Sequence, residues 1–171
     1  YWLKEYPLLK TNSIGPILTR LDTFLRPRII RNMVSQKTGL DFESILNENK
    51  ILFVKLPQGL IGKENSFLLG SLILSKLHQA AFARQAKQNR PPFFIYLDEF
   101  HNFITPSIKE MLSGVRKYNV GLILSHQDLQ QLQREDTELL NSVLGNTYTR
   151  IVFRVGEPDA KKLQDGFADF D

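Results

Sequence analysis

Short apolar runs recur along the chain from residue 50 onward, each bounded by polar or turn-forming residues. They occupy residues 51–54, 93–97, 120–124 and 151–153. Continuous apolar runs of this length are typical of strands that are covered on both faces of a sheet. We therefore expect a strand at each of the four runs.

The stretches between these runs show the apolar spacing of helices. We expect helices over residues 67–85, with Asn65 or Ser66 as N-cap, and over residues 107–118, 127–133, 137–144 and 158–167. Residues 88–92 are polar, end in two prolines and predict a loop. This alternation indicates an α/β fold with a mostly parallel sheet and helices on both of its faces.

Residues 1–47 have a different character and predict a helical segment. One amphipathic helix is indicated by apolar residues at i, i+3 and i+4 spacing: Ile17, Leu18, Leu21, Phe24 and Leu25. Pro27 ends this helix and can occupy the first turn of the next. The stretch is locally basic, through Arg20, Arg26, Arg28 and Arg31. These arginines form either a solvated helix face or a surface for nucleic acid or a neighbouring subunit.

The composition excludes several classes of site. The chain has no cysteine, which rules out disulfide frameworks and thiolate metal sites. Its 22 Lys and Arg exceed its 18 Asp and Glu by four, too small an excess to identify a nucleic-acid-binding protein. His78, His101 and His126 lack metal-ligand spacing, and the Gly-x-Ser-x-Gly motif of serine hydrolases is absent.

No targeting or membrane segment is evident in the sequence. The apolar run at residues 68–74 is soon followed by Lys76 and is far shorter than the roughly 20 residues of a membrane span. The N-terminus lacks a signal-peptide pattern and does not begin with methionine. We expect a cytoplasmic protein, and we expect this chain to be an internal fragment of it.

Two adjacent carboxylates, Asp98 and Glu99, follow the apolar run at residues 93–97. Ligands of open α/β sheets bind beyond the carboxyl ends of the strands. Charge at such a position needs a partner, which Mg²⁺ with phosphate oxygens and waters would provide. Asp98 would hold the metal or its water, and Glu99 would orient and polarise a water that attacks a γ-phosphate. The alternative is that the two carboxylates cap the following helix.

Further polar groups flank the apolar run at residues 120–124. After it, Gln127 could contact the γ-phosphate or the attacking water; alternatively, Ser125 caps a helix and Gln127 lies in solvent. Before it, Arg116 and Lys117 end a helix, where basic residues complement the helix dipole. The alternative for Arg116 is an arginine finger that reaches a nucleotide on a neighbouring subunit.

Residues 94–103 (FIYLDEFHNF), 112–118 (LSGVRKY) and 121–127 (GLILSHQ) follow one another in a specific order. Gly145-Asn146, residues 150–156 and Asp159-Ala160 continue it, and Arg31, Asp41-Phe42, residues 50–56 and Gly59 precede it. This ordered set resembles the HerA/FtsK superfamily of hexameric DNA-pumping ATPases. It is most similar to the branch of conjugative coupling proteins and type IV secretion ATPases, and the resemblance covers nearly the whole chain.

The resemblance implies a fold and roles for particular residues. Residues 48–171 would form the C-terminal part of a RecA-like P-loop NTPase core, with residues 1–47 as a helical segment of the same ATPase domain. Asp98 and Glu99 would be the Walker B pair, and Gln127 would be the motif-three glutamine. The arginine that acts in trans would be Arg116, with weaker candidates in Arg150 and Arg154.

The resemblance also implies cofactors and partners. The cofactors would be ATP and Mg²⁺, and the full-length protein would be an ATPase. The partners would be DNA, further copies of the protein in a hexamer, and secretion-machinery proteins at the membrane. Other parts of the full-length protein would make the association with the membrane.

The phosphate-binding loop of such motors is missing from the chain. The sequence contains no G-x-x-x-x-G-K-[ST] motif. Residues 59–64 imitate one, but only two residues separate Gly59 from Gly62, and Glu64 stands in place of Ser or Thr. We expect the loop to lie upstream of the chain, and we expect the chain alone to bind ATP poorly and to hydrolyse it negligibly.

Three functions remain open at this point. The first is an ATP-driven motor that moves DNA, or in a close variant protein, through a ring. The second is a non-catalytic assembly module of a secretion or DNA-processing complex, and the third is an unrelated nucleotide-binding α/β protein. If an upstream part contributes strands to the same sheet, the chain exposes a sheet edge and apolar surface, and we expect it to dimerise or aggregate.

Overall fold

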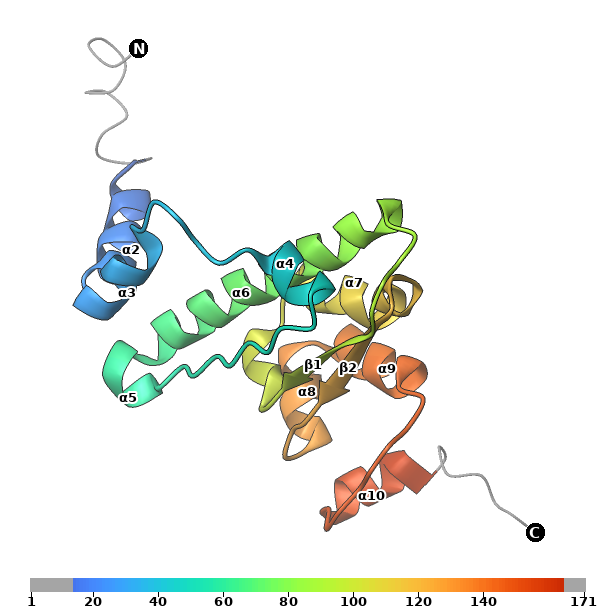
Figure 1. Ribbon diagram of the computed structural model, residues 1–171. Coiled ribbons are helices and arrows are strands. Elements are labelled where there is room, and N and C mark those ends of the chain that lie inside the picture. The colour runs from blue at the N-terminus through green and yellow to red at the C-terminus, as the bar shows by residue number, and fades with distance from the viewer. Residues whose placement is uncertain (1–13, 165–171) are drawn as a thin grey trace. The chain divides into compact units, whose positions relative to one another are not determined.

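The structure is a computed structural model that describes residues 14–164 (Figure 1). The chain divides into two compact units. One unit comprises Tyr1–Asp41 and Val54–Ser66, and the other comprises Phe42–Phe53 and Phe67–Asp171. Both strands of the structure lie in the second unit.

The described part of the first unit is helical, as the N-terminal pattern predicted. Its helices are α2 (Gly15–Leu25), α3 (Arg28–Val34), α5 (Gln58–Ile61) and the start of α6 (Lys63–Ala83). Pro27 is extended and stands at the N-cap of α3, which confirms the expected break at this proline. No residue of α2 is buried, and the guanidinium of Arg26 pairs with Asp22 at 2.7 Å. The arginines of this segment therefore lie at the surface.

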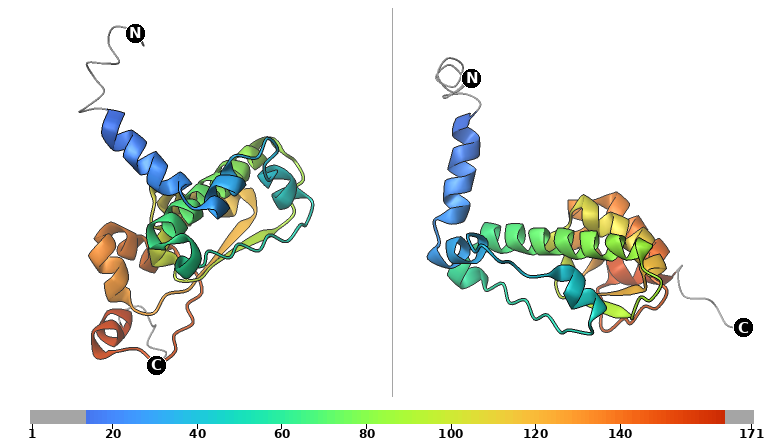
Figure 2. Two further views of the ribbon diagram at one scale, coloured as in Figure 1. Left: turned by 90° about the vertical axis from the view of Figure 1, so that its left-hand side faces the viewer. Right: turned by 45° about the horizontal axis from the view of Figure 1, so that its top comes forward.

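Helix α6 begins at Lys63 rather than at Phe67. Gly62 has a φ of 84°, a conformation that separates α5 from α6 and that glycine adopts readily. Asn65 and Ser66 therefore lie inside the first turns of α6, so the expected N-cap is wrong; the Ser66 hydroxyl instead donates to the Gly62 carbonyl at 2.9 Å. The helix then continues without a break to Ala83 (Figure 2). Residues 59–64, which partly match the phosphate-loop pattern, therefore belong to α5 and α6, with Gly62 between the two helices.

The second unit contains the predicted strands β1 (Phe93–Leu97) and β2 (Val120–Leu124). Between them lie the short turn η3 (Phe100–Phe103), helix α7 (Pro106–Gly114) and the turn η4 (Val115–Tyr118), so the expected helix over 107–118 is confirmed in two pieces. The other elements are α4 (Phe42–Asn47), η2 (Arg84–Ala86), α8 (Leu129–Glu135), α9 (Thr137–Asn146) and α10 (Glu157–Gln164). Residues 165–167 of the expected last helix lie outside the described residues.

Strands β1 and β2 pair in parallel, with Phe93 opposite Val120 at one end and Leu97 opposite Leu124 at the other. Along β1, Ile95 is buried, whereas Phe94 and Tyr96 are exposed. Helices therefore cover only one face of this strand, and the expectation of helices on both faces is wrong for the described residues. The ring of Phe94 lies against Gly121, where a side chain on the glycine would meet it at 2.7 Å.

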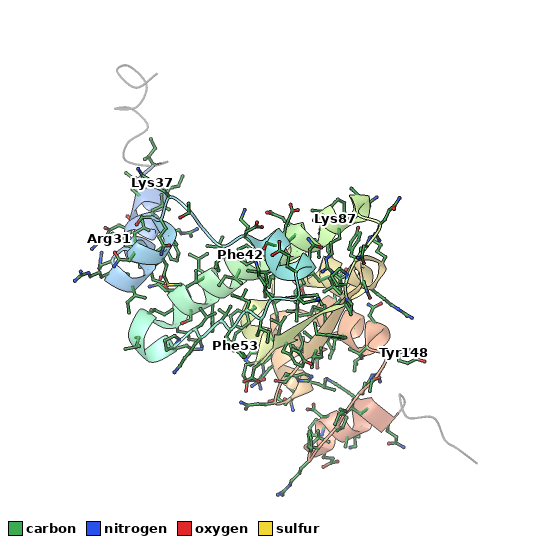
Figure 3. The ribbon with its side chains drawn as sticks, viewed as in Figure 1. Arg31, Lys37, Phe42, Phe53, Lys87 and Tyr148 are labelled. Atoms are coloured by element: carbon green, nitrogen blue, oxygen red, sulfur yellow. The ribbon has the colours of Figure 1, made fainter. Side chains whose placement is uncertain are left out.

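The strands expected at residues 51–54 and 151–153 are not formed. Both segments are irregular, and the sheet of the described residues consists of β1 and β2. The exposed fractions of their large side chains are 81% for Ile51, 91% for Phe53, 79% for Ile151 and 86% for Phe153. Figure 3 places Phe53 on the segment that follows α4. An apolar run becomes a strand only where a neighbouring strand supplies hydrogen-bond partners, and within residues 14–164 these two segments have none.

The core of the second unit packs the buried face of the sheet against helices. Its fully buried members are Leu46, Ala81, Phe100, Ile108, Met111, Leu132 and Leu139. Among these apolar residues lies Arg84, whose guanidinium is buried and which the sequence pattern did not single out. It donates to the backbone carbonyls of Leu46, Pro91, Tyr118 and Asn119 and to the side-chain oxygen of Asn47. Arg84 therefore ties the end of α4 to the residues that enter β1 and β2.

Candidate functional site

The predicted polar residues lie at the carboxyl ends of the two strands. Asp98 and Glu99 follow β1, and Ser125 to Gln127 follow β2. Strand pairing continues one step beyond the ladder, because the amide of Ser125 donates to the Leu97 carbonyl at 2.9 Å and the amide of Phe100 donates to the Ser125 carbonyl at 3.1 Å. These bonds place the two polar segments side by side at one edge of the sheet.

Glu99 has the left-handed backbone conformation, with φ of 49° and ψ of 46°. A positive φ is uncommon for residues other than glycine, and such residues concentrate at functional sites. Here the conformation ends β1 and starts the turn η3. The following Phe100 is fully buried, and its ring packs edge-on against the ring of His126 at 5.5 Å between centroids. The turn that carries the two carboxylates is thus anchored in the core.

Two side-chain hydrogen bonds join the ends of the strands. The hydroxyl of Ser125 donates to Asp98 Oδ1 at 2.5 Å, and Gln127 Nε2 donates to Glu99 Oε1 at 2.6 Å. Three predicted site residues, Asp98, Glu99 and Gln127, are therefore brought together with Ser125. The structure also contains His101 in this cluster, with its Nδ1 at 3.3 Å from Glu99 Oε2. The sequence offered one signal for it, its position two residues after Glu99.

The helix-capping interpretations of these residues do not describe the structure. Glu99 occupies the N-cap position of η3, but its side chain makes no capping hydrogen bond. Asp128, not Ser125, caps α8, because its carboxylate accepts from the amide of Gln131 at 2.7 Å. Helix α8 accordingly begins at Leu129, two residues after the expected start at Gln127. Gln127 is exposed, as that alternative expected, but its side-chain amide donates to Glu99.

The arginine candidates are not paired with the two carboxylates in the part of the chain that the structure describes. Arg116 belongs to η4, which precedes β2, so it lies at the opposite end of this strand from Gln127 and is exposed. Arg150 is held at the end of α9, where it donates to Thr147 Oγ1 at 3.2 Å and to the carbonyl of Leu144. Arg154 is exposed. Within residues 14–164, none of the three forms a hydrogen bond or ion pair with Asp98 or Glu99.

At the strand ends, Asp98 is the carboxylate that could hold a hydrated magnesium ion. Across the described residues, no group of three or more His, Asp or Glu is arranged to hold a metal. Asp98 is exposed, and one of its oxygens is positioned by Ser125. Mg²⁺ usually keeps several waters and takes one or two carboxylates together with substrate phosphates. Asp98 meets this requirement as a single, accessible ligand.

A membrane span requires a helix that is both long and apolar. No helix within residues 14–164 has the length and apolar character needed to cross a membrane.

Comparison with known proteins gives a match to a protein family. Residues 92–164 match the family model described as the TraM recognition site of TraD and TraG. The matched region is less than half of the chain and contains β1, β2, Asp98, Glu99 and Gln127. No curated protein and no solved structure matches the chain. The family match supports a relationship between this chain and conjugative coupling proteins.

Proposed function

We propose that this chain supplies the catalytic carboxylates of an ATP-driven motor of the conjugative coupling-protein type, within a RecA-like core. The observation that carries the proposal is the pair of hydrogen bonds from Ser125 to Asp98 and from Gln127 to Glu99. These bonds gather acidic and amide groups beyond the carboxyl ends of adjacent parallel strands, where α/β proteins bind ligands. The family match over residues 92–164 supports the same class of protein.

Each side chain has a defined task in this proposal. Asp98 would hold Mg²⁺ through a water, and the bound ion would neutralise charge on the phosphates. Glu99 would orient the attacking water and take its proton, and Gln127 would hold that water or the γ-phosphate. Because Arg116 is exposed at the far end of β2, it is suited to reach the nucleotide of a neighbouring copy in a ring. DNA would be held mainly through its phosphates, with little sequence preference.

The test is ATP hydrolysis by the full-length natural protein, with and without DNA. We expect DNA to stimulate hydrolysis. The substitution Glu99→Gln should lower the rate roughly 100-fold or more, as expected for loss of a general base, and Arg116→Ala should have an effect of similar size or larger. Glu110→Gln is the matched control, because Glu110 is an exposed carboxylate on α7 outside the cluster. Its rate should equal that of the unmodified protein.

The oligomeric state of each variant must be unchanged for these rates to be compared. If the full-length protein neither binds nor hydrolyses ATP, the carboxylates are structural and the motor proposal is wrong. The chain would then be an assembly module.

We also propose that residues 92–164 recognise a partner protein of the conjugative DNA-processing complex. The support is the description of the matching family, which names recognition of TraM by TraD and TraG. Calorimetric titration of the chain with a TraM-type protein from the same conjugative system tests this. Saturable binding that does not require DNA is expected. Binding of DNA with no binding of the TraM-type protein would contradict the proposal.

A further inference from the structure

Each oxygen of the Glu99 carboxylate lies close to a side-chain nitrogen. Oε1 accepts a hydrogen bond from Gln127 Nε2 at 2.6 Å. Oε2 is buried, without a hydrogen-bond partner among the described residues, and lies 3.3 Å from His101 Nδ1. The inner side of the carboxylate therefore faces an imidazole and not solvent.

The ring nitrogen Nδ1 of His101 faces Glu99 Oε2. It too is buried and has no hydrogen-bond partner within residues 14–164. A buried polar atom without a partner is costly, and a donor and an acceptor in contact distance relieve the cost for each other. A small rotation of the imidazole completes this bond when Nδ1 carries the proton. In the described structure the two atoms are in contact, 3.3 Å apart, without this hydrogen bond.

The backbone holds this pair in place. Glu99 and His101 flank Phe100, which is fully buried, and the left-handed conformation of Glu99 turns the chain at this point. The side chain of His101 is 18% exposed and that of Glu99 is 34% exposed. The backbone that carries Glu99 and His101 is therefore anchored by Phe100, and Gln127, at the end of the neighbouring strand, is exposed.

We propose that His101 is a positioning residue that latches Glu99 in a resting orientation. The inference rests on the proposed ATPase function, in which Glu99 takes the proton of the attacking water. Oε1 accepts from Gln127 and Oε2 faces His101, so Glu99 would turn toward that water only when the contact with His101 opens. Gln127 can stay with Glu99 and share the water, so the histidine contact is the one that must break.

Kinetics of the full-length natural protein test the latch. The substitution His101→Leu removes the donor at nearly the same volume, and we expect kcat without DNA to rise roughly fivefold, the size of effect produced by losing one opposing hydrogen bond. KM for ATP should stay close to its original value, and stimulation by DNA should shrink. The substitution His101→Asn, which can place a side-chain amide donor near the position of Nδ1, should restore the low resting rate.

The matched control is His78→Leu. His78 also faces a carboxylate, with its Nδ1 at 3.7 Å from Glu110 Oε2, but this pair lies on α6 and α7 outside the cluster. It should leave the resting rate unchanged. A fall in kcat for His101→Leu, or equal rates for the Leu and Asn variants, would overturn the proposal.

A second measurement reads the contact without ATP hydrolysis. The NMR signals of the Gln127 side-chain amide report its hydrogen bond to Glu99 in the 171-residue chain. We expect His101→Leu and Glu99→Gln to shift these signals, and His78→Leu to leave them in place. Unshifted signals in His101→Leu would overturn the latch. If the signals shift but the full-length protein does not hydrolyse ATP, the Glu99–His101 contact is supported and the proposed function is wrong.

Discussion

Strands β1 and β2 and the segments at residues 51–54 and 151–153 have the same kind of sequence and different structures. All four are short apolar runs, but only β1 and β2 form a ladder. Ile95 in β1 is 5% exposed, whereas Ile51 and Ile151 are 81% and 79% exposed. Apolar character alone therefore does not make a strand; a paired neighbour and a covering layer do.

The paired strands are also held at both ends. At their entrance, Arg84 binds the carbonyls of Pro91 and Asn119, and the Asn119 side chain donates to the carbonyl of Arg90 at 2.7 Å. At their exit, Ser125 and Gln127 bind the two carboxylates that follow β1. At each end of the ladder, side chains from outside the strands add to the backbone hydrogen bonds between them.

The largest expected effect is the loss of the entrance clamp. Arg84→Ala leaves several buried carbonyls without their charged donor, and hydrogen bonds to charged groups contribute about 1.5–3 kcal/mol each. We expect the free energy of unfolding to fall by about 3 kcal/mol or more, measured by urea denaturation. Burial lowers the pKa of the Arg84 guanidinium, with a further contribution from the charge of Arg90.

Arg90→Ala is the control for this clamp. Arg90 also donates to carbonyls, those of Gln85, Lys87 and Lys117, but it is only half-buried. Arg90→Ala should lower the free energy of unfolding by clearly less than Arg84→Ala, because water can replace a partly exposed donor. Equal losses for the two arginines would show that burial of Arg84 is not what secures the strands.

The comparison of paired and unpaired runs is tested directly by one substitution at two positions. Ile95→Ala removes a buried side chain and should lower the free energy of unfolding by about 2–4 kcal/mol. Ile51→Ala removes an exposed one and should change it by less than about 0.5 kcal/mol. Denaturant titration of both variants decides the matter. A loss at Ile51 as large as that at Ile95 would mean that the segment at 51–54 is buried in solution.

A smaller effect is expected where the connection between the strands meets α9. Lys109 on α7 pairs with Asp136 at 2.6 Å, and the Asp136 carboxylate also accepts from the amide of Leu139 at the start of α9. The hydrogen bond from Lys109, and after it that from Leu139, lowers the pKa of Asp136. Because the folded pKa lies below the unfolded one, this stabilisation is present at neutral pH and is lost as the pH falls through the folded pKa.

Asp136→Asn keeps a capping acceptor and removes the charge. We expect a modest fall in Tm at pH 7. The difference from the unmodified chain should shrink once the pH drops below about 3.9, the ordinary value of an aspartate, and vanish below the lowered folded pKa. Thermal melts between pH 2 and 7 measure this. A difference that persists at pH 2 would place the effect in packing and not in charge.

The smallest effect on stability, but a visible effect on association, is expected at the unpaired runs. Phe53 and Phe153 are almost fully exposed, and apolar surface of this kind promotes self-association. We expect the chain to dimerise or aggregate in light scattering. Phe53→Ser with Phe153→Ser should reduce this while changing the free energy of unfolding by less than about 0.5 kcal/mol. A clean monomer before substitution would contradict the expectation.

The sequence predicted the elements that depend on local information. The helix before Pro27, both strands of the ladder, and the helices between and after them were read from apolar spacing and turn residues. The predicted helix starts were less accurate. Gly62 separates α5 from α6 and Asp128 caps α8, and apolar periodicity marks neither position. The clustering of Asp98, Glu99 and Gln127 followed from the rule that parallel strands end at one edge of a sheet.

The sequence by itself thus determined which residues can form strands and which polar groups end up at one edge of the sheet, because both follow from the order of residues along a strand. Only the tertiary structure decided that Arg84 is a buried clamp, that His101 faces Glu99, and that the runs at 51–54 and 151–153 stay unpaired. The clamp and the missing pairing depend on residues far apart in the sequence, and the contact of His101 with Glu99 depends on the left-handed backbone conformation of Glu99. Whether a residue is buried or a strand is paired depends on two segments of the chain. The apolar pattern of one segment gives no information about the other.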